Sequence, residues 1–281
     1  MRKTAAVSTI FAIAVMTGCA QAPQAGSKSA KPPQISPEAR AQLAPTGTLR
    51  VAVLTSNPVI GGKNSAGELS GTTVEIGRAL AASAGVPVRM LEYTAVNKLV
   101  EDAALTGTGG AWDVTVVAFD PARRNVLDFA PAHIAADGFL SVLVPPGSAA
   151  RSMADIDRAG MRVAAVRSAA TAIILERTLK HATVAQAENE NAAFALMKEG
   201  KADGYAQNRF MLRARAQTLP GSRILDDSFA GLRLAFALPK ARPAAARFVA
   251  AFIAGAKTSG VVQKAIDVAG MAGDVKVASA E

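Results

Sequence analysis

Arg123 is the residue of this sequence best suited to anchor a small anion. It belongs to the segment Asp120-Pro121-Ala122-Arg123-Arg124. A planar guanidinium holds a carboxylate through two parallel hydrogen bonds and stays charged when it is desolvated. Asp120 and Pro121 have the residue types of a helix N-cap and a first helical position, and backbone N–H groups there would face the same anion. We predict that Arg123 binds a carboxylate, that Asp120 caps the helix and that Arg124 is solvated; the alternative for Arg123 is a surface ion pair.

A second segment suited to anion binding is Arg167-Ser168-Ala169-Ala170-Thr171. It lies between an expected strand and an expected helix, where free backbone N–H groups at the helix start suit an anion. Thr171 is either a ligand contact or a helix cap. Arg167 adds positive charge to a cleft if it points inward, and a surface orientation is equally compatible with the sequence.

The sequence lacks the residues that metal, nucleophile and cofactor sites require. The two histidines, His133 and His181, have neither metal-ligand spacing nor a neighbouring nucleophile motif, and we expect a loop residue and a helix-end residue. The sequence has no glycine-rich phosphate loop, no cysteine pair and no HExxH motif. We therefore expect a binding protein without cofactor or metal, and not an enzyme.

The charge of the chain and its distribution limit the classes of partner that we expect. Lys and Arg number 31 against 22 Asp and Glu, a formal net charge of +9. Because this excess is spread along the chain, without basic runs and interleaved aromatics, we exclude nucleic acid. A diffuse positive field is compatible with anionic solutes, with an anionic membrane surface or with solubility alone. We expect a monomer.

The N-terminal segment has the pattern of an export signal. Two basic residues precede an apolar stretch over residues 4–16, which is too short to span a bilayer. Met16-Thr17-Gly18-Cys19 resembles the bacterial lipobox, in which cleavage before the cysteine lets its thiol carry a diacylglyceryl group. The resemblance implies a signal peptide over residues 1–18 and a periplasmic protein anchored to a membrane by lipidated Cys19. The alternative is an ordinary secreted protein with a stray cysteine.

The segment that follows has a tether's composition. Residues 19–45 are rich in Ala, Pro, Gln, Ser and Lys and have no periodic apolar face. We predict a flexible tether that holds the folded part away from the bilayer. Since Cys19 is the only cysteine, no internal disulfide can form and stability must come from the core.

From Thr48 onward, β-rich runs alternate with helical patterns, which predicts an α/β fold with a largely parallel sheet. Thr72 and Glu75 have the spacing of a capping box at the first helix, which Gly85 ends. The expected strands span residues 49–54, 86–93, 113–119, 161–166, 183–187, 202–207 and 232–238. The expected helices span residues 72–84, 96–105, 171–179, 191–199, 209–218, 243–259 and 261–269.

Several motifs occur in an order typical of one receptor family. They are Gly47-Thr48-Leu49-Arg50-Val51-Ala52-Val53, Asn64-Ser65-Ala66-Gly67-Glu68-Leu69-Ser70-Gly71, Trp112-Asp113-Val114 followed by residues 120–131, and Gly200-Lys201-Ala202-Asp203-Gly204. On these motifs the chain resembles, over residues 48–269, the family 3 extracellular solute-binding proteins, the amino-acid-type periplasmic receptors of ABC importers.

The resemblance implies a periplasmic-binding-protein type II fold with two lobes, a central ligand cleft and two hinge crossovers, near residues 141–145 and 231–234. Lobe 1 would comprise residues 46–143 and 233–281, and lobe 2 residues 144–232. Such a receptor closes over a small anionic or zwitterionic solute and delivers it to an ABC permease in the inner membrane. The solute class that we expect is a small carboxylate, either an amino acid or an organic acid.

The family pattern also locates the ligand contacts. They fall at Arg123, Ala118, Asn57, Ser168, Ala169, Ala170, Thr171 and Asn208. Ser168 replaces a glycine, alanines replace threonine hydroxyls, and Asn57 stands where many relatives offer an aromatic ring. Asn208 stands where amino-acid receptors place an acid against the ligand's α-ammonium. Losing that bond costs on the order of 1.5 to 3 kcal/mol, so we predict an anion in preference to a standard α-amino acid.

Two other functions share this scaffold. Cyclohexadienyl-dehydratase-like periplasmic enzymes need a general acid or base in the cleft. A sensory solute-binding lipoprotein uses the same closing cleft but reports to a receptor, and the sequence does not separate sensing from transport.

Overall fold

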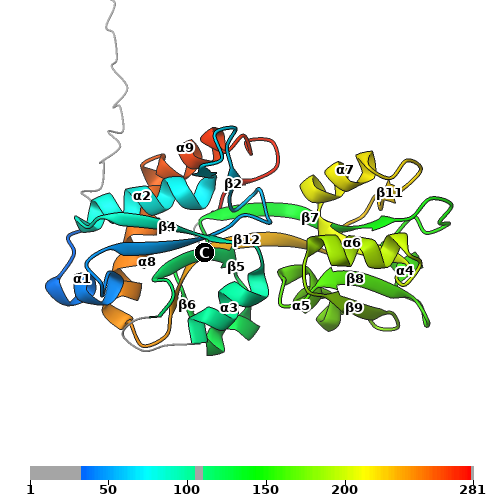
Figure 1. Ribbon diagram of the computed structural model, residues 1–281, viewed down its shortest axis with the longest axis horizontal. Coiled ribbons are helices and arrows are strands. Elements are labelled where there is room, and N and C mark those ends of the chain that lie inside the picture. Colours follow the sequence, from blue (N-terminus) through cyan, green and yellow to red (C-terminus); the bar gives the residue numbers. More distant parts are fainter. Residues whose placement is uncertain (1–32, 105–109, 280–281) are drawn as a thin grey trace, which may run out of the picture.

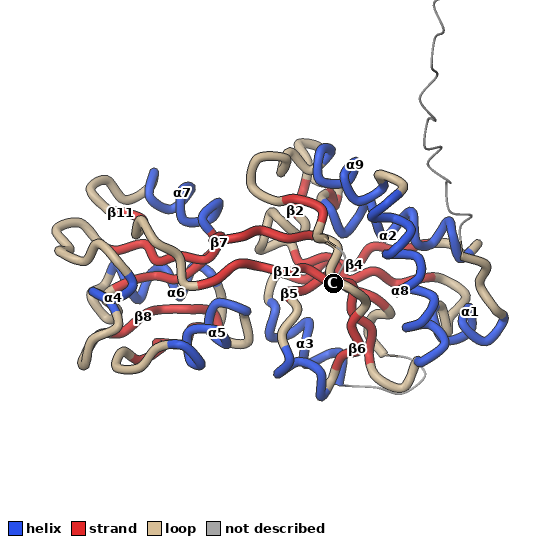
Figure 2. Tube along the Cα trace, turned by 180° about the vertical axis from the view of Figure 1, so that it is seen from behind, coloured by secondary structure: helices blue, strands red, loops and turns tan. Residues whose placement is uncertain are grey.

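The computed structural model describes residues 33–104 and 110–279, which form two α/β lobes joined by a pair of long strands (Figure 1). These strands are β7 (Ile134–Val144) and β12 (Ala230–Pro239), which pair antiparallel and pass from one lobe to the other (Figure 2). The predicted signal peptide and Cys19 lie outside the described residues.

The first lobe is built on a sheet with the strand order β4-β1-β5-β12, in which β1 is parallel to both β4 and β5. Its strands are β1 (Leu49–Leu54), β2 (Gly62–Lys63), β3 (Leu69–Ser70), β4 (Val88–Tyr93), β5 (Val114–Ala118), β6 (Leu127–Phe129) and β13 (Lys276–Val277). Its helices are α1 (Pro37–Leu43), α2 (Thr72–Ala84), α3 (Val96–Ala104), the 3-10 helix η1 (Pro121–Asn125), α8 (Pro243–Thr258) and α9 (Val261–Val268). Helices α2 and α9 cover one face of this sheet and α3 the other (Figure 1).

The second lobe continues the sheet in the order β7-β10-β8-β9, with β8 parallel to both β9 and β10. Its elements are α4 (Met153–Ile156), β8 (Arg162–Val166), α5 (Ala170–Thr178), β9 (Thr183–Ala187), α6 (Glu190–Lys198), β10 (Gly204–Asn208), α7 (Arg209–Gln217) and β11 (Arg223–Ile224). The alternating elements confirm the predicted α/β fold.

The crossovers differ in part from the prediction. Residues 140–143 of β7 already pair with β10 in the second lobe, so the first crossover precedes the expected segment 141–145. It contains Gly138, whose φ of 60° suits a residue without a Cβ. On the second crossover the register shifts between Ala230 and Leu232, which overlaps the expected segment 231–234.

The prediction of a tether up to residue 45 is wrong for α1. Ser36 caps this helix by accepting from the Ala39 backbone N–H at 3.1 Å, and Pro37 supplies its first position. Ala39 and Leu43, one turn apart, are buried, and the helix packs on α8. This two-residue apolar face was too short to be recognised by periodicity.

Of the two N-caps predicted from the sequence, one is wrong and one is confirmed. Thr72 forms no capping box, because Gly71 is the N-cap of α2 and the Thr72 hydroxyl donates to the Val59 carbonyl at 2.9 Å. Asp120 is the N-cap of η1, as predicted, and accepts from the Ala122 N–H at 2.9 Å.

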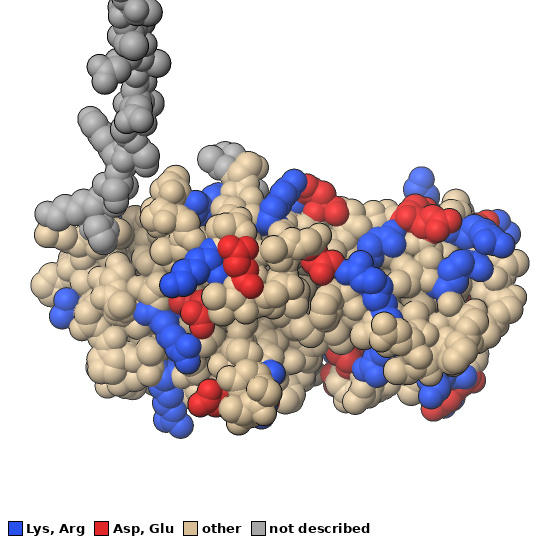
Figure 3. All heavy atoms as spheres, turned by 90° about the horizontal axis from the view of Figure 1, so that it is seen from above, with Lys and Arg blue, Asp and Glu red and all other residues tan. Residues whose placement is uncertain are grey.

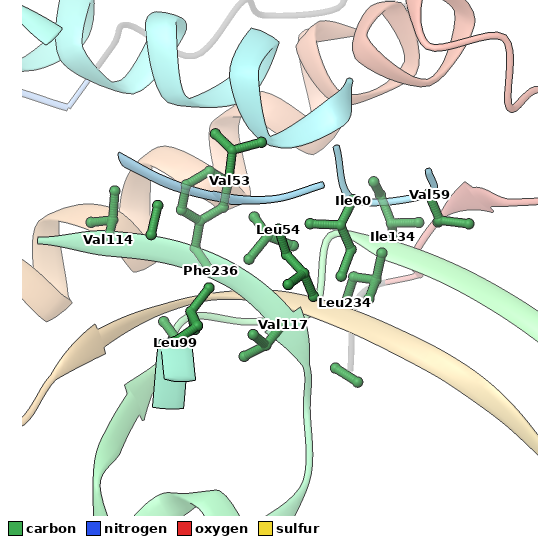
Figure 4. Packing of buried hydrophobic residues seen from close by; sticks show 14 of the residues in the cluster. Val53, Leu54, Val59, Ile60, Leu99, Val114, Val117, Ile134, Leu234 and Phe236 are labelled. Carbon is green, nitrogen blue, oxygen red and sulfur yellow. The ribbon is translucent and has the colours of Figure 1, made fainter. Parts of the chain in front are cut away.

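Side chains of β1, β5 and β12 pack together in the core of the first lobe (Figure 4). Val53, Val114 and Phe236 are fully buried there, and each such side chain stabilises the fold by roughly 1.5 to 3 kcal/mol. Leu54 and Leu234 belong to the same core but also reach the space between the lobes. Among the described residues no single helix has the length and apolarity to cross a membrane; α8 and α9 meet that test only as a pair bent by 74°.

Candidate functional site

A cavity of about 50 Å³ lies where the two lobes meet. The first lobe contributes residues that follow β1, β4 and β5, and the second lobe contributes the starts of α5, α6 and α7. Ligands bind beyond the carboxyl ends of parallel strands in folds of this class, and these are such ends. Its polar lining consists of Ser56, Asn57, Thr94, Arg123, Thr171, Asn189, Glu190, Gln207 and Asn208.

Arg123 is buried in this cavity, with 4% of its surface exposed. Its Nη1 donates to the Ala118 carbonyl at 2.8 Å and its Nη2 to the Ser168 carbonyl of the second lobe at 2.5 Å. Burial lowers the pKa of Arg123 to about 10, against the attraction of Asp120, so the guanidinium remains charged at neutral pH. No described carboxylate lies within 4 Å of the Arg123 guanidinium. The neighbouring carboxylate, that of Asp120, pairs with Arg177 at 3.3 Å. The surface ion pair considered for Arg123 is therefore absent here.

The second anion segment lies at the start of α5. Ser168 has a φ of 61°, the left-handed conformation that a glycine adopts without strain. Ala169 is the N-cap of α5 and makes no side-chain capping bond, so the N–H groups of the first turn stay open to a ligand. Ala169, Ala170 and Thr171 line the cavity, whereas Ser168 contributes its carbonyl to Arg123.

Two polar groups of the cavity have no protein partner among the described residues. They are the Arg123 Nε and the Thr171 hydroxyl, and both residues are buried. Buried polar groups without partners cost free energy, so such groups around one cavity indicate that a ligand or water supplies the missing bonds. The sequence was compatible with Thr171 as a ligand contact or as a helix cap. Thr171 is not the cap, because Ala169 is the N-cap of α5.

Asn57 and Asn208 meet across the cleft. The Asn208 Nδ2 donates to the Asn57 Oδ1 at 3.4 Å, and the Asn208 Oδ1 accepts from the Met211 N–H at 2.9 Å as the N-cap of α7. Asn57 also accepts from the Val59 N–H at 3.2 Å. The oxygen of Asn208 is thus engaged by its own helix, and its nitrogen faces the cleft as a donor.

Glu190 is the site residue that the sequence analysis missed. It lies at the first position of α6, lines the cavity, and is half-buried. The Tyr205 hydroxyl donates to its Oε2 at 2.6 Å. Burial raises the pKa of Glu190 above its ordinary value, although hydrogen bonds from Tyr205 and Gln207 and the charge of Arg215 oppose the rise. Acidic residues are common in the first turn of a helix, so the type and position of Glu190 did not indicate a ligand contact.

Several contacts besides the arginine bridge join the lobes around the cavity. Asn97 donates to Glu188 at 3.4 Å, and Arg213 forms an ion pair with Asp274. Arg167 points outward and pairs with Glu188 at 2.5 Å, which selects the surface orientation of the two that we considered. The described conformation is therefore one in which the lobes are closed on each other.

The histidines lie away from this cavity. His133 is a loop residue, as predicted, but it is fully buried and neither ring nitrogen has a partner among the described residues. His181 is exposed beyond the end of α5. Within the described ranges no group of three His, Cys, Asp or Glu side chains could hold a metal ion. Basic and acidic side chains are interspersed on the face seen in Figure 3, in keeping with the dispersed charge of the sequence.

Comparisons with known proteins establish the fold. No family model and no curated protein matches the chain. The solved structure of the ancestral amino acid-binding protein AncCDT-1, a precursor of cyclohexadienyl dehydratase, is similar at 21% identity over 81% of this chain and 97% of that chain, with a TM-score of 0.64. The holo form of ArgBP from T. maritima is similar at 19% identity over 77% and 93%, with a TM-score of 0.63.

A third similar structure is the amino acid ABC transporter substrate-binding protein AbpA from Streptococcus pneumoniae, bound to L-arginine. It shares 20% identity over 83% of this chain and 98% of that chain, with a TM-score of 0.66. These likenesses confirm the predicted two-lobed periplasmic-binding-protein fold.

Proposed function

We propose that this chain is the periplasmic receptor of an ABC importer, captures a small carboxylate-bearing solute between its lobes, and is anchored to a membrane through lipidated Cys19. The observation that carries the proposal is Arg123, a buried guanidinium that bridges both lobes and has no carboxylate of the described residues within 4 Å. A buried charge is costly unless it is paired, and a ligand carboxylate provides the pair.

The geometry of Arg123 also supports a coupling between binding and closure. Its present partners are backbone carbonyls from the two lobes, Ala118 and Ser168. A carboxylate that accepts from the guanidinium on one side can accept from the N–H groups at the start of α5 on the other. The ligand would then join the lobes, and a permease would recognise the closed shape.

The transport role draws on the resemblance of the chain and on its similar structures. AbpA is named as an amino acid ABC transporter substrate-binding protein, and AncCDT-1 as an amino acid-binding protein. Lipid anchoring rests on the lipobox-like segment that ends at Cys19. Metabolic labelling with a fatty acid, in the wild type and in Cys19→Ser, tests the anchor without reference to the ligand.

A thermal-shift screen of residues 33–281 tests the receptor proposal. The panel contains amino acids, dicarboxylates, keto acids and aromatic acids, each measured with the wild type and with Arg123→Ala. A true ligand raises the melting temperature in a concentration-dependent way, because it binds only the folded state. We expect an acid that shifts the wild type and not the variant. A panel without any shift would contradict carboxylate binding.

Glu190 favours one second candidate, a periplasmic enzyme of the cyclohexadienyl dehydratase type. A carboxyl group with a raised pKa in the same cavity as a buried arginine has the properties of a general acid. One similar structure is described as a precursor of such an enzyme. Product formation from prephenate or arogenate, abolished in Glu190→Gln, would establish the enzyme; binding without turnover would exclude it for these substrates.

A further inference from the structure

The cavity between the lobes holds two formal charges of opposite sign. Among its described lining residues, Arg123 is the one cation and Glu190 the one anion. No ion pair joins the two side chains within 4 Å, so each presents its charge to the cavity separately. A ligand complementary to this lining carries a negative group and a positive group.

Glu190 lacks a cationic partner within the described residues. The nearest candidate, Arg215, donates to Asn191 at 2.6 Å and lies over the Phe194 ring at 5.0 Å. The neutral hydroxyl of Tyr205 donates to one oxygen of Glu190. Among the described residues no Lys or Arg forms an ion pair with Glu190 within 4 Å, and Arg215 acts on it only at longer range. A partly desolvated carboxylate of this kind is stabilised by a cation that arrives with the ligand.

The two charges border different openings of the cavity. Arg123 also lines a hollow beside Val100 and Ser168, which Glu190 does not line. Glu190 also lines a groove of about 610 Å³ beside Asn97, Lys98 and Glu101, which Arg123 does not line. A positive group held by Glu190 would therefore lie toward this groove, and a carboxylate held by Arg123 toward the other opening.

The position next to the carboxylate lacks an acid. Asn208 lines the cavity, but its oxygen is taken by the Met211 N–H and its nitrogen is a donor. An ammonium group on the carbon beside the carboxylate would meet no negative charge there. An α-amino acid therefore matches this lining less well than an isomer whose amino group stands at the far end.

We propose that Glu190 binds the amino group of a solute whose carboxylate is held by Arg123, and that the solute is an ω-amino carboxylate. This inference rests on the proposed receptor function. It agrees with the expectation that a standard α-amino acid is disfavoured. It differs from the expectation of an anion, because Glu190 supplies the negative charge that Asn208 lacks.

Calorimetric titration with three matched probes tests the inference. The probes are 4-aminobutyrate, its isomer 2-aminobutyrate, and butyrate, with 3-aminopropanoate and 5-aminopentanoate to vary the length. We expect one ω-amino acid of this series to bind at least about tenfold more tightly than its α-isomer and than the unaminated acid. Glu190→Gln should abolish this preference.

Glu199→Gln is the matched control, because Glu199 is exposed at the end of the same helix, does not line the cavity or the groove, and pairs with Lys201. It should retain the preference. Preference for the α-isomer, or a ranking unchanged in Glu190→Gln, would overturn the inference while carboxylate binding still supported the receptor. If no carboxylate bound, or if Arg123→Ala bound as well as the wild type, the receptor proposal itself would fail and the inference with it.

Discussion

His133 makes the stability of this protein sensitive to acid. Its side chain is fully buried, neither ring nitrogen has a described partner, and its ring lies 5.3 Å from that of Phe236. Burial, with a smaller contribution from the charge of Lys257, lowers the pKa of His133 to about 3 from 6.5. The folded state therefore binds this proton less tightly than the unfolded state.

Linkage fixes the sign and the size of the effect. Stability is complete above pH 6.5, where the imidazole is neutral in both states, and it falls as the pH is lowered toward 3. The slope inside this window is about 1.4 kcal/mol per pH unit. Integrated between pH 7 and pH 5, the loss is about 2 kcal/mol, and this value requires only that the folded pKa lies well below 5.

His133→Leu isolates this contribution, because leucine has a similar volume and the substitution breaks no side-chain hydrogen bond. Urea unfolding of the wild type and the variant at pH 7, 6 and 5 gives the difference in unfolding free energy at each pH. We expect the variant to gain about 2 kcal/mol relative to the wild type between pH 7 and pH 5. Parallel curves for His133→Leu would refute the reasoning.

Two further substitutions test the structural supports of the site. Asp113 is fully buried and accepts from Arg50 at 2.8 Å and from Arg242 at 2.9 Å, so Asp113→Ala should lower the unfolding free energy by about 3 to 5 kcal/mol. Asp128, which forms an exposed ion pair with Lys240, serves as the control, and Asp128→Ala should lower the unfolding free energy by less than about 1 kcal/mol. Equal losses in Asp113→Ala and Asp128→Ala would contradict the argument. Ser168→Gly should stabilise by about 0.5 to 1 kcal/mol in the same assay, because φ is positive there, and a loss would show that the backbone is unstrained.

Local patterns predicted most of the fold. The first strand was predicted with the bounds of β1, and α8 and α9 within one residue of their ends. These segments have uninterrupted apolar periodicity, so local preference and tertiary packing agree. The prediction of a tether is wrong for α1. Two buried residues on a short helix show no periodicity in the sequence, and this helix is stabilised by its contacts with α8.

The site was predictable where the sequence matches the pattern of the receptor family. Arg123 was found because a guanidinium suits a carboxylate and because it lies in a matched motif, and it lines the cavity with Asn57 and Asn208, which the same pattern located. Glu190 was missed because an acid at a helix start has an ordinary electrostatic explanation, and its place in the cleft depends on how the second lobe meets the first. The left-handed backbone of Ser168 was not predicted from the serine itself; the one signal was that Ser168 stands where the family pattern has a glycine, which this conformation favours.

The most direct test of the account is the affinity of the best carboxylate ligand, measured by calorimetry in Arg123→Ala and Arg124→Ala. Arg124 is the matched control, because it is exposed and stacks over Phe119 at 5.1 Å, whereas Arg123 is buried in the cavity. We expect Arg123→Ala to weaken binding by about tenfold to a hundredfold or more, and Arg124→Ala to leave it within about twofold. Equal affinities in the two variants would contradict the assignment of Arg123 as the anchor.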